Sequence, residues 1–220
     1  RRNCRQTTST IGSRALKRDT PSMSSTTSIL RAGPRDRASI AAVLDRLPEL
    51  EGRPIHVSYL PFLHARRGRL SSGEHQPGQP VHAASFIRAR RIVLDHALRS
   101  THGELVRVIL HELFHFAWVR LGNPVRASYE GMLRHEIAAR ARGELGWSAE
   151  SRKRNDRRWK GNTPAARRAW RDYLCESFCD TGAWLYGGMR RHDEFTLARR
   201  HRDRRAEWFA LQFGNRPIPL

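Results

Sequence analysis

The sequence predicts an α+β fold in which helices dominate and a small β-portion comes early in the chain. Between residues 54 and 95, two segments are rich in β-branched and aromatic residues, a composition typical of strands. After residue 100, apolar residues recur at helical spacing in several long segments, most of which end near Gly or Pro. The chain has 220 residues, of which 39% are hydrophobic, and this suits one packed domain.

The early part of the chain is predicted to contain one helix and two strand regions. Apolar residues at helical spacing predict a short helix over 36–47. Residues 54–63 predict a strand, and residues 86–95 predict a second strand region, which could pair with the residues before it as a hairpin. Residues 66–80 contain three Gly and two Pro and predict an exposed loop. Asp95 is expected to cap a turn, with a contact to the functional site as the alternative.

The second half of the chain is predicted to be mostly helical. Thr101 and Glu104 form a capping box, after which apolar residues continue a helix to Gly122. The strongly polar residues 148–162 predict a solvated loop or an irregular helix. Three further helices are expected, over 128–145, 163–187 and 193–213.

The two ends of the chain are predicted to lie outside the folded domain. Residues 1–35 form a basic leader rich in Ser, Thr and Arg, which we expect to be disordered. Its composition fits either a mitochondrial-type transit peptide or residues upstream of a true start at Met23. The folded domain is expected to span 36–214, with 215–220 as a tail.

Charge and cysteine usage restrict the class of protein. Lys and Arg total 41 against 21 acidic residues, and the net charge of +20 favours nucleic acid, anionic membrane surfaces or acidic partners. No segment approaches the roughly 18 apolar residues that a membrane span requires. The cysteines do not suggest a disulfide framework, so we expect a cytoplasmic bacterial protein.

The predicted central helix contains the sequence His111-Glu112-Leu113-Phe114-His115. Histidines four residues apart lie on one face of a helix, about 6 Å apart, so both imidazoles can bind one zinc ion. Glu112 projects beside that face and can accept a proton from a water molecule that attacks a carbonyl. This pattern is typical of a zinc peptidase, because burying three such polar groups without a metal would be costly.

A catalytic zinc site usually has three protein ligands, so a third must come from elsewhere in the chain. The strongest candidate is Glu176, in the helix predicted over 163–187. Asp180 lies one turn later on the same face and could bond the second nitrogen of a ligating histidine. Rival ligands are three residues of the preceding helical region and, as thiolates, two cysteines: His135, Glu136, Glu144, Cys175 and Cys179.

With HExxH on one helix and ExxxD on a later helix, the sequence resembles the gluzincin group of zinc metallopeptidases. The resemblance covers these two helices only. It implies that His111, His115 and Glu176 bind one catalytic Zn²⁺ ion, that Glu112 is the general base and that Asp180 orients a histidine. It also implies a zincin-like fold, in which the active-site helix and the ligand helix pack with a small sheet whose edge strand binds extended substrate.

Two features differ from the gluzincin pattern. The segment between His115 and Glu176 is longer than in many members of the group. The His or Tyr that often stabilises the tetrahedral intermediate is not fixed by the sequence, and four residues are candidates: Tyr173, Tyr186, His192 and His201. The third histidine of the metzincin pattern is absent after His115.

We therefore expect a zinc-dependent peptidase that acts on a peptide or protein substrate. A function of another class is also open: a non-catalytic nucleic-acid-binding protein that uses the basic stretches 152–158 and 199–205. The two hypotheses combine in a metalloprotease recruited to DNA by its charge, which would resemble SprT-like proteases in purpose. Bound zinc supports the first hypothesis, and salt-dependent binding of DNA or RNA supports the second.

Overall fold

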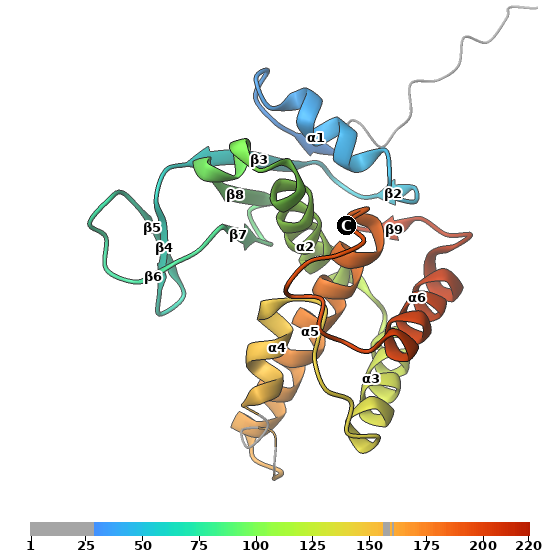
Figure 1. Cartoon of the computed structure of the whole chain (residues 1–220). Helices are drawn as coiled ribbons and strands as arrows, with labels where there is room; N and C mark the ends of the chain where they lie inside the picture. Colours follow the sequence, from blue (N-terminus) through green and yellow to red (C-terminus); the bar gives the residue numbers. More distant parts are fainter. Residues whose placement is uncertain (1–28, 156–158, 160) are drawn as a thin grey trace, which may run out of the picture.

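The computed structural model describes residues 29–155, 159 and 161–220, and these residues form an α+β architecture (Figure 1). The helices are α1 (Arg37–Leu44), the short 3₁₀ helix η2 (His96–Ser100), α2 (His102–Arg120), α3 (Asn123–Ala138), α4 (Trp147–Arg154), α5 (Pro164–Tyr186) and α6 (Arg199–Phe213). The strands are β1 (Leu30–Arg31), β2 (Leu50–Glu51), β3 (Ile55–Leu60), β4 (Leu63–Arg66), β5 (Arg69–Ser72), β6 (Gln79–Pro80), β7 (Ala83–Phe86), β8 (Arg91–Asp95) and β9 (Ile218–Pro219).

The main sheet has four strands in the order β1-β3-β8-β7. Strands β1, β3 and β8 run parallel, whereas β7 runs antiparallel to β8 and contacts α2. Ile55, Ile92 and Leu94 of the central strands are fully buried, which explains their β-branched and aliphatic composition. Within the described residues, β7 has no partner strand on its outer side and is therefore the open edge beside α2.

Helices α2 and α5 pack against each other at the centre of the helical part. Phe114 of α2 stacks on Tyr186 and meets Phe178 edge-on, and both partners belong to α5. A Cβ atom at Gly182 would lie 2.5 Å from the Phe114 ring, so only glycine permits this approach of the two helices. The close packing brings the middle of α5 against the histidines of α2.

A buried ionic network ties α6 to α3 and α5. The fully buried Arg205 pairs with Glu136 at 2.6 Å and with Glu144 at 2.8 Å. Glu144 also pairs with Lys153 at 2.9 Å and accepts a hydrogen bond from Tyr173. Because each carboxylate has cationic and hydrogen-bonding partners, the network compensates the cost of burying its charges.

The helix that carries the HExxH motif agrees with the sequence prediction, because α2 runs from His102 to Arg120. The predicted capping box is wrong, however. Thr101 makes no side-chain capping bond, and Glu104 pairs with Arg107 at 2.7 Å instead of reaching back to the helix start. The start of α2 is therefore held by an ion pair within its own first turns.

Residues 66–80, which the sequence predicts as a loop, instead contain part of an antiparallel sheet of strand order β5-β4-β6. This three-stranded arm projects beside β7 and away from α1 (Figure 1). Arg67 and Gly68 have φ angles of 49° and 75°, the left-handed conformation that a two-residue hairpin turn requires. The glycines of this segment thus mark hairpin geometry, and the prediction of a plain loop is wrong.

The helices differ from the predicted ones in three places. α3 begins at Asn123, not near 128, because Pro124 occupies the first turn, where its missing N–H costs nothing. α6 begins only at Arg199, because the amides of Thr196 and Leu197 bind the Glu144 carbonyl at 2.9 and 3.0 Å. The polar stretch predicted as a loop or irregular helix contains α4 in its first half.

The folded part reaches beyond the predicted domain boundaries at both ends. β1 lies within the predicted leader and pairs with β3, and β9 lies within the predicted tail and pairs with β2. The remainder of the predicted leader, residues 1–28, lies outside the described residues. Among the helices of the described ranges, we find none with the length and apolar character of a membrane span.

Candidate metal centre

The two motif histidines lie on one face of α2, as their spacing predicts. Their Nε2 atoms are 3.2 Å apart, and their ring centroids are 4.9 Å apart in an edge-on arrangement. Both side chains are partly buried, with 13% of His111 and 20% of His115 exposed. The two nitrogens therefore face the same small region of space.

Glu176 of α5 completes this group. Its Oε2 atom lies 3.3 Å from His111 Nε2 and 4.0 Å from His115 Nε2. Its other oxygen, Oε1, forms an ion pair with Arg152 Nη2 of α4 at 2.8 Å. One carboxylate oxygen is thus held by a protein cation, and the other is directed at the two imidazoles.

Asp180 fixes the orientation of the His111 ring. Its Oδ1 accepts a 2.7 Å hydrogen bond from His111 Nδ1, and its Oδ2 accepts a 2.9 Å bond from the Ala149 amide in α4. A Cβ atom at Gly146 would come within 2.3 Å of this carboxylate, so a glycine is required where the chain enters α4. With Nδ1 protonated and bonded to Asp180, the Nε2 lone pair of a neutral His111 points toward Glu176.

Glu112 lies between the histidines and the sheet. Ser85 of β7 donates a 2.5 Å hydrogen bond to Glu112 Oε2 and lies 3.0 Å from the Glu112 carbonyl oxygen. A cleft of about 530 Å³ opens here, lined by His111, Glu112, Ala83 and residues just before β7. The edge strand, the acid and the first histidine therefore border one open space.

The charges of the site shift the pKa values of His111 and Glu176 in opposite directions. Burial by itself would lower the pKa of His111, but Asp180 and Glu176 raise that pKa well above its usual value. Burial would raise the pKa of Glu176, but the hydrogen bond and charge of His111, together with His115 and Arg152, lower it to about 2. The group therefore favours positive charge at the point where Glu176 faces the imidazoles.

The donor set fits a zinc ion. In a tetrahedral site with metal–ligand bonds of about 2.0–2.1 Å, donor atoms lie about 3.3 Å apart. Two of the three distances among His111 Nε2, His115 Nε2 and Glu176 Oε2 are 3.2 and 3.3 Å, and the third is 4.0 Å. Neutral imidazoles and a carboxylate would present three lone pairs to one point, an arrangement that needs a cation.

A second group with metal-binding residue types shares His115. Cys175 Sγ lies 3.4 Å from His115 Nδ1, the ring nitrogen that faces away from His111, and Cys179 is close to both. Hydrogen bonds from Cys179 and His115, against the effect of burial, lower the pKa of Cys175 to about 6. The rival thiolate ligands are therefore adjacent to the candidate centre, on the opposite nitrogen of the shared histidine.

The other rival ligands lie elsewhere. Glu136 and Glu144 are fully buried and paired with Arg205, so neither is available to the motif histidines. His135 is exposed on α3, where its Nδ1 contacts the Gly131 carbonyl. Since all three belong to a different side of the helical part, these alternatives are wrong as partners of His111 and His115.

None of the four predicted stabilising residues reaches the centre. Tyr173 is buried and donates a 2.6 Å hydrogen bond to Glu144, and His201 is buried on α6 beside Arg200. Tyr186 stacks on Phe114 in the core, and His192 pairs with Glu104 near the start of α2. Placing Tyr173 or His201 at the reacting atoms is therefore wrong.

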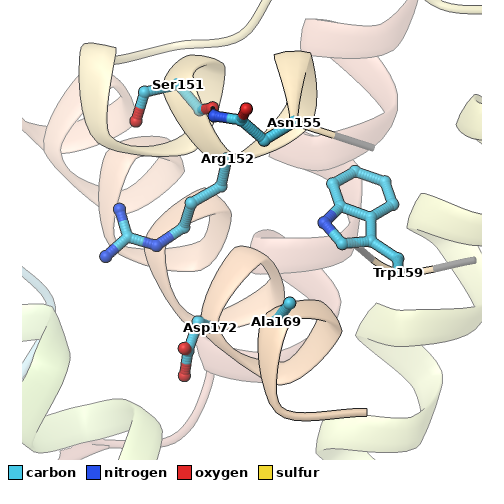
Figure 2. A pocket seen from close by; sticks show the side chains of 6 residues that line it. All are labelled: Ser151, Arg152, Asn155, Trp159, Ala169 and Asp172. Carbon is cyan, nitrogen blue, oxygen red and sulfur yellow. Dashed lines mark hydrogen bonds between the residues drawn. The ribbon is translucent and has the colours of Figure 1, made fainter. Parts of the chain in front are cut away.

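Two residues that contact the centre were not found from the sequence. Ser85 belongs to no recognisable sequence motif. Its contact with Glu112 depends on the strand register, which the sequence does not specify. Arg152 belongs to the polar stretch predicted as a solvated loop or irregular helix, yet it contacts Glu176 and lines a pocket of about 270 Å³ between α4 and α5. Figure 2 shows its side chain extending between the two helices, with Asp172 below it and Trp159 on the opposite side of the pocket.

Comparison of the chain with protein-family models, with curated proteins and with solved structures gives no match.

Proposed function

We propose that this protein is a zinc-dependent peptidase of the gluzincin type with a zincin-like fold. The observation that carries the proposal is the convergence of His111 Nε2, His115 Nε2 and Glu176 Oε2, with Asp180 behind His111. The open edge of β7 beside the same cleft supports a peptide as the substrate, because an extended chain can add to a sheet edge through main-chain hydrogen bonds.

His111, His115 and Glu176 would hold the zinc ion, leaving a fourth position open. When bound, zinc would polarise the scissile carbonyl and lower the pKa of a coordinated water. Asp180 keeps the His111 ring in the tautomer whose Nε2 can donate its lone pair. The protein residues thus set the geometry of the centre before any substrate enters.

Glu112 is the general base of the proposed reaction. Its carboxylate takes a proton from the attacking water and passes it to the nitrogen of the leaving amine. Ser85 holds one of its oxygens through the 2.5 Å hydrogen bond and links it to the edge strand. Since Glu112 is buried and fixed, little reorganisation is needed at the moment of reaction.

Replacing Glu112 by Gln tests this function. We expect cleavage of a fluorogenic peptide library to fall by about 100-fold or more, because the base is lost. Zinc content should not change, because the proposed ligands are His111, His115 and Glu176. The matched control is Glu207→Gln on the exposed surface of α6, which should leave both readouts unchanged. A Glu112→Gln variant with full activity contradicts the mechanism.

We do not propose nucleic-acid binding through the two basic stretches. Arg152 is engaged by Glu176, and Arg205 is fully buried between two carboxylates. Both stretches therefore contribute cations to the interior of the protein as well as to its surface. Net charge alone does not identify a partner.

A further inference from the structure

Three arginines form an unpaired positive cluster at the tip of the β4–β5 hairpin. Arg66, Arg67 and Arg69 are all exposed, and no acidic side chain of the described ranges forms an ion pair with them. They line a cavity of about 570 Å³ together with Ser71, Gln76 and Pro77. This cavity is a concave surface that presents three guanidinium groups, each able to bind a carboxylate through two parallel hydrogen bonds.

The arm that carries this cluster is anchored to the main sheet. Asp95, at the end of β8, accepts a 2.8 Å hydrogen bond from the Leu63 amide at the base of β4. The Val81 amide binds the Leu63 carbonyl at 3.0 Å, which closes the other side of the base. A Cβ atom at Gly78 would lie 2.8 Å from the Ala65 carbonyl oxygen, so this glycine lets the returning chain pack on β4. The base of the arm is thus fixed to the main sheet.

One short segment joins the arginine cavity to the catalytic cleft. Gln76 and Pro77 line the cavity, and residues 79–83 line the cleft beside His111 and Glu112. Figure 1 shows the arm continuing through β6 into β7, the open edge. A polypeptide that lies along β7 and continues past Ala83 would therefore run toward the arginines.

We propose that the arginine cluster is a binding site for acidic side chains of the substrate polypeptide, several residues from the bond that is cut. The proposal rests on the proposed peptidase function and names its substrate class. In an extended chain, which rises about 3.3 Å per residue, the acidic residues lie beyond the positions that pair with β7. Antiparallel pairing with β7, the commoner kind of strand pairing, places them on the C-terminal side of the cut.

The test is a binding assay that does not depend on hydrolysis. The full chain with Glu112→Gln is loaded with zinc and titrated into fluorescent peptides that carry four Glu residues at the C-terminal end, at the N-terminal end, or Gln instead. We expect the C-terminal acidic peptide to bind roughly tenfold more tightly than the Gln peptide, because exposed ion pairs each contribute a modest amount. This preference should weaken with salt.

The decisive variant carries Arg66→Gln, Arg67→Gln and Arg69→Gln, and it should lose the preference for the acidic peptide. A matched variant with Arg168→Gln, Arg171→Gln and Arg204→Gln removes the same charge from exposed helical positions and should retain that preference. Equal losses in both variants would show that only net charge matters and would overturn the proposal. An oligonucleotide that binds more tightly than the acidic peptide, and only through Arg66, Arg67 and Arg69, would also overturn it.

Failure of this proposal and failure of the peptidase function give different results. Acidic-peptide binding through the arm in a wild-type chain that cleaves no peptide contradicts the peptidase function alone. Cleavage by the wild type with no effect of the acidic residues contradicts the role of the arm alone.

Discussion

Two groups of buried polar side chains lie on two faces of α5. They contain similar residue types, but only one of them has a buried arginine that pairs with its carboxylates. Ser177 and Thr181 on one face contact Arg205 at 3.0 and 3.3 Å, within the network of Glu136 and Glu144. Glu176 and Asp180, each the preceding residue in the sequence, face the motif histidines instead. Residues that are adjacent in the sequence therefore point to different sides of α5, one toward the buried ion network and the other toward the candidate metal centre.

The difference lies in whether donors match acceptors. In the network, the Arg205 guanidinium donates to both carboxylates, and Lys153 and Tyr173 donate further bonds to Glu144. At the candidate centre, two imidazole nitrogens and one carboxylate oxygen converge, and no Lys or Arg of the described residues pairs with that oxygen. The Arg205 network, in which each carboxylate has a cationic partner, is complete and stabilises the fold. The group of His111, His115 and Glu176 is incomplete in this sense and can bind a cation.

Breaking the complete network should have the largest effect on stability. Arg205→Met leaves two buried carboxylates without their main partner, and we expect the free energy of unfolding to fall by about 3–5 kcal/mol. Denaturant titration measures this loss, with the exposed neighbour Arg204→Met as the control. A loss below about 1 kcal/mol, typical of a surface ion pair, would show that Arg205 is not a structural centre.

Acid should weaken the same network. Burial by itself would raise the pKa of Glu144, but Arg205 and Lys153 outweigh burial and lower it from 4.5 to about 2. A depressed pKa stabilises the fold above pH 4.5, and this stabilisation, on the order of 3 kcal/mol, is lost as the pH falls toward 2. Denaturant titrations between pH 6 and pH 2.5 measure it. A Glu144→Gln variant with the same acid dependence as the wild type would contradict this assignment.

Changing the partner of His111 should affect zinc rather than folding. Asp180→Asn keeps the size of the side chain but weakens its hold on the ring, and we expect zinc affinity to fall about 10–100-fold. The free energy of unfolding of the metal-free chain is the second readout. Asp172→Asn, about two turns earlier on α5 and exposed, is the matched control. Unchanged zinc affinity in Asp180→Asn would separate Asp180 from the centre.

The smallest effect on zinc affinity is expected from the replacement of Arg152. Arg152 forms an ion pair with the Glu176 oxygen that faces away from the imidazoles, and its side chain is 39% exposed, so solvent screens the pair. Arg152→Gln should change zinc affinity by only about fivefold or less, because a surface pair contributes no more than about 1 kcal/mol. Loss of zinc comparable to that of a ligand variant, measured by competition with a chelator, would show that Arg152 does more than position Glu176.

Local periodicity was sufficient to predict one half of the candidate centre. The distance between His111 and His115 depends only on the helical repeat. The same repeat places Glu176 and Asp180 on one face of their helix. That these two pairs meet depends on the approach of α2 and α5, which Gly182 permits. The sequence suggested this meeting only through resemblance to a known pattern.

The remaining features depend on tertiary placement. Ser85 reaches Glu112 because of the register between β7 and β8, and Arg152 reaches Glu176 because α4 packs on α5. Glu136 and Glu144 had the residue type of a metal ligand, but Arg205, far along the chain, removes them from consideration. Residue type and local spacing do not distinguish a carboxylate that has a buried partner from one that lacks it.

The most direct test of metal binding by His111, His115 and Glu176 is the metal content of the purified protein. It is measured by elemental analysis in the wild type, His115→Ala and Glu176→Ala. We expect about one zinc per chain in the wild type and none in either variant. Zinc that persists in Glu176→Ala and is lost on Cys175→Ser would instead assign the ion to the cysteine side of His115. A wild type that contains no zinc after expression and purification in zinc-replete conditions would contradict the central claim.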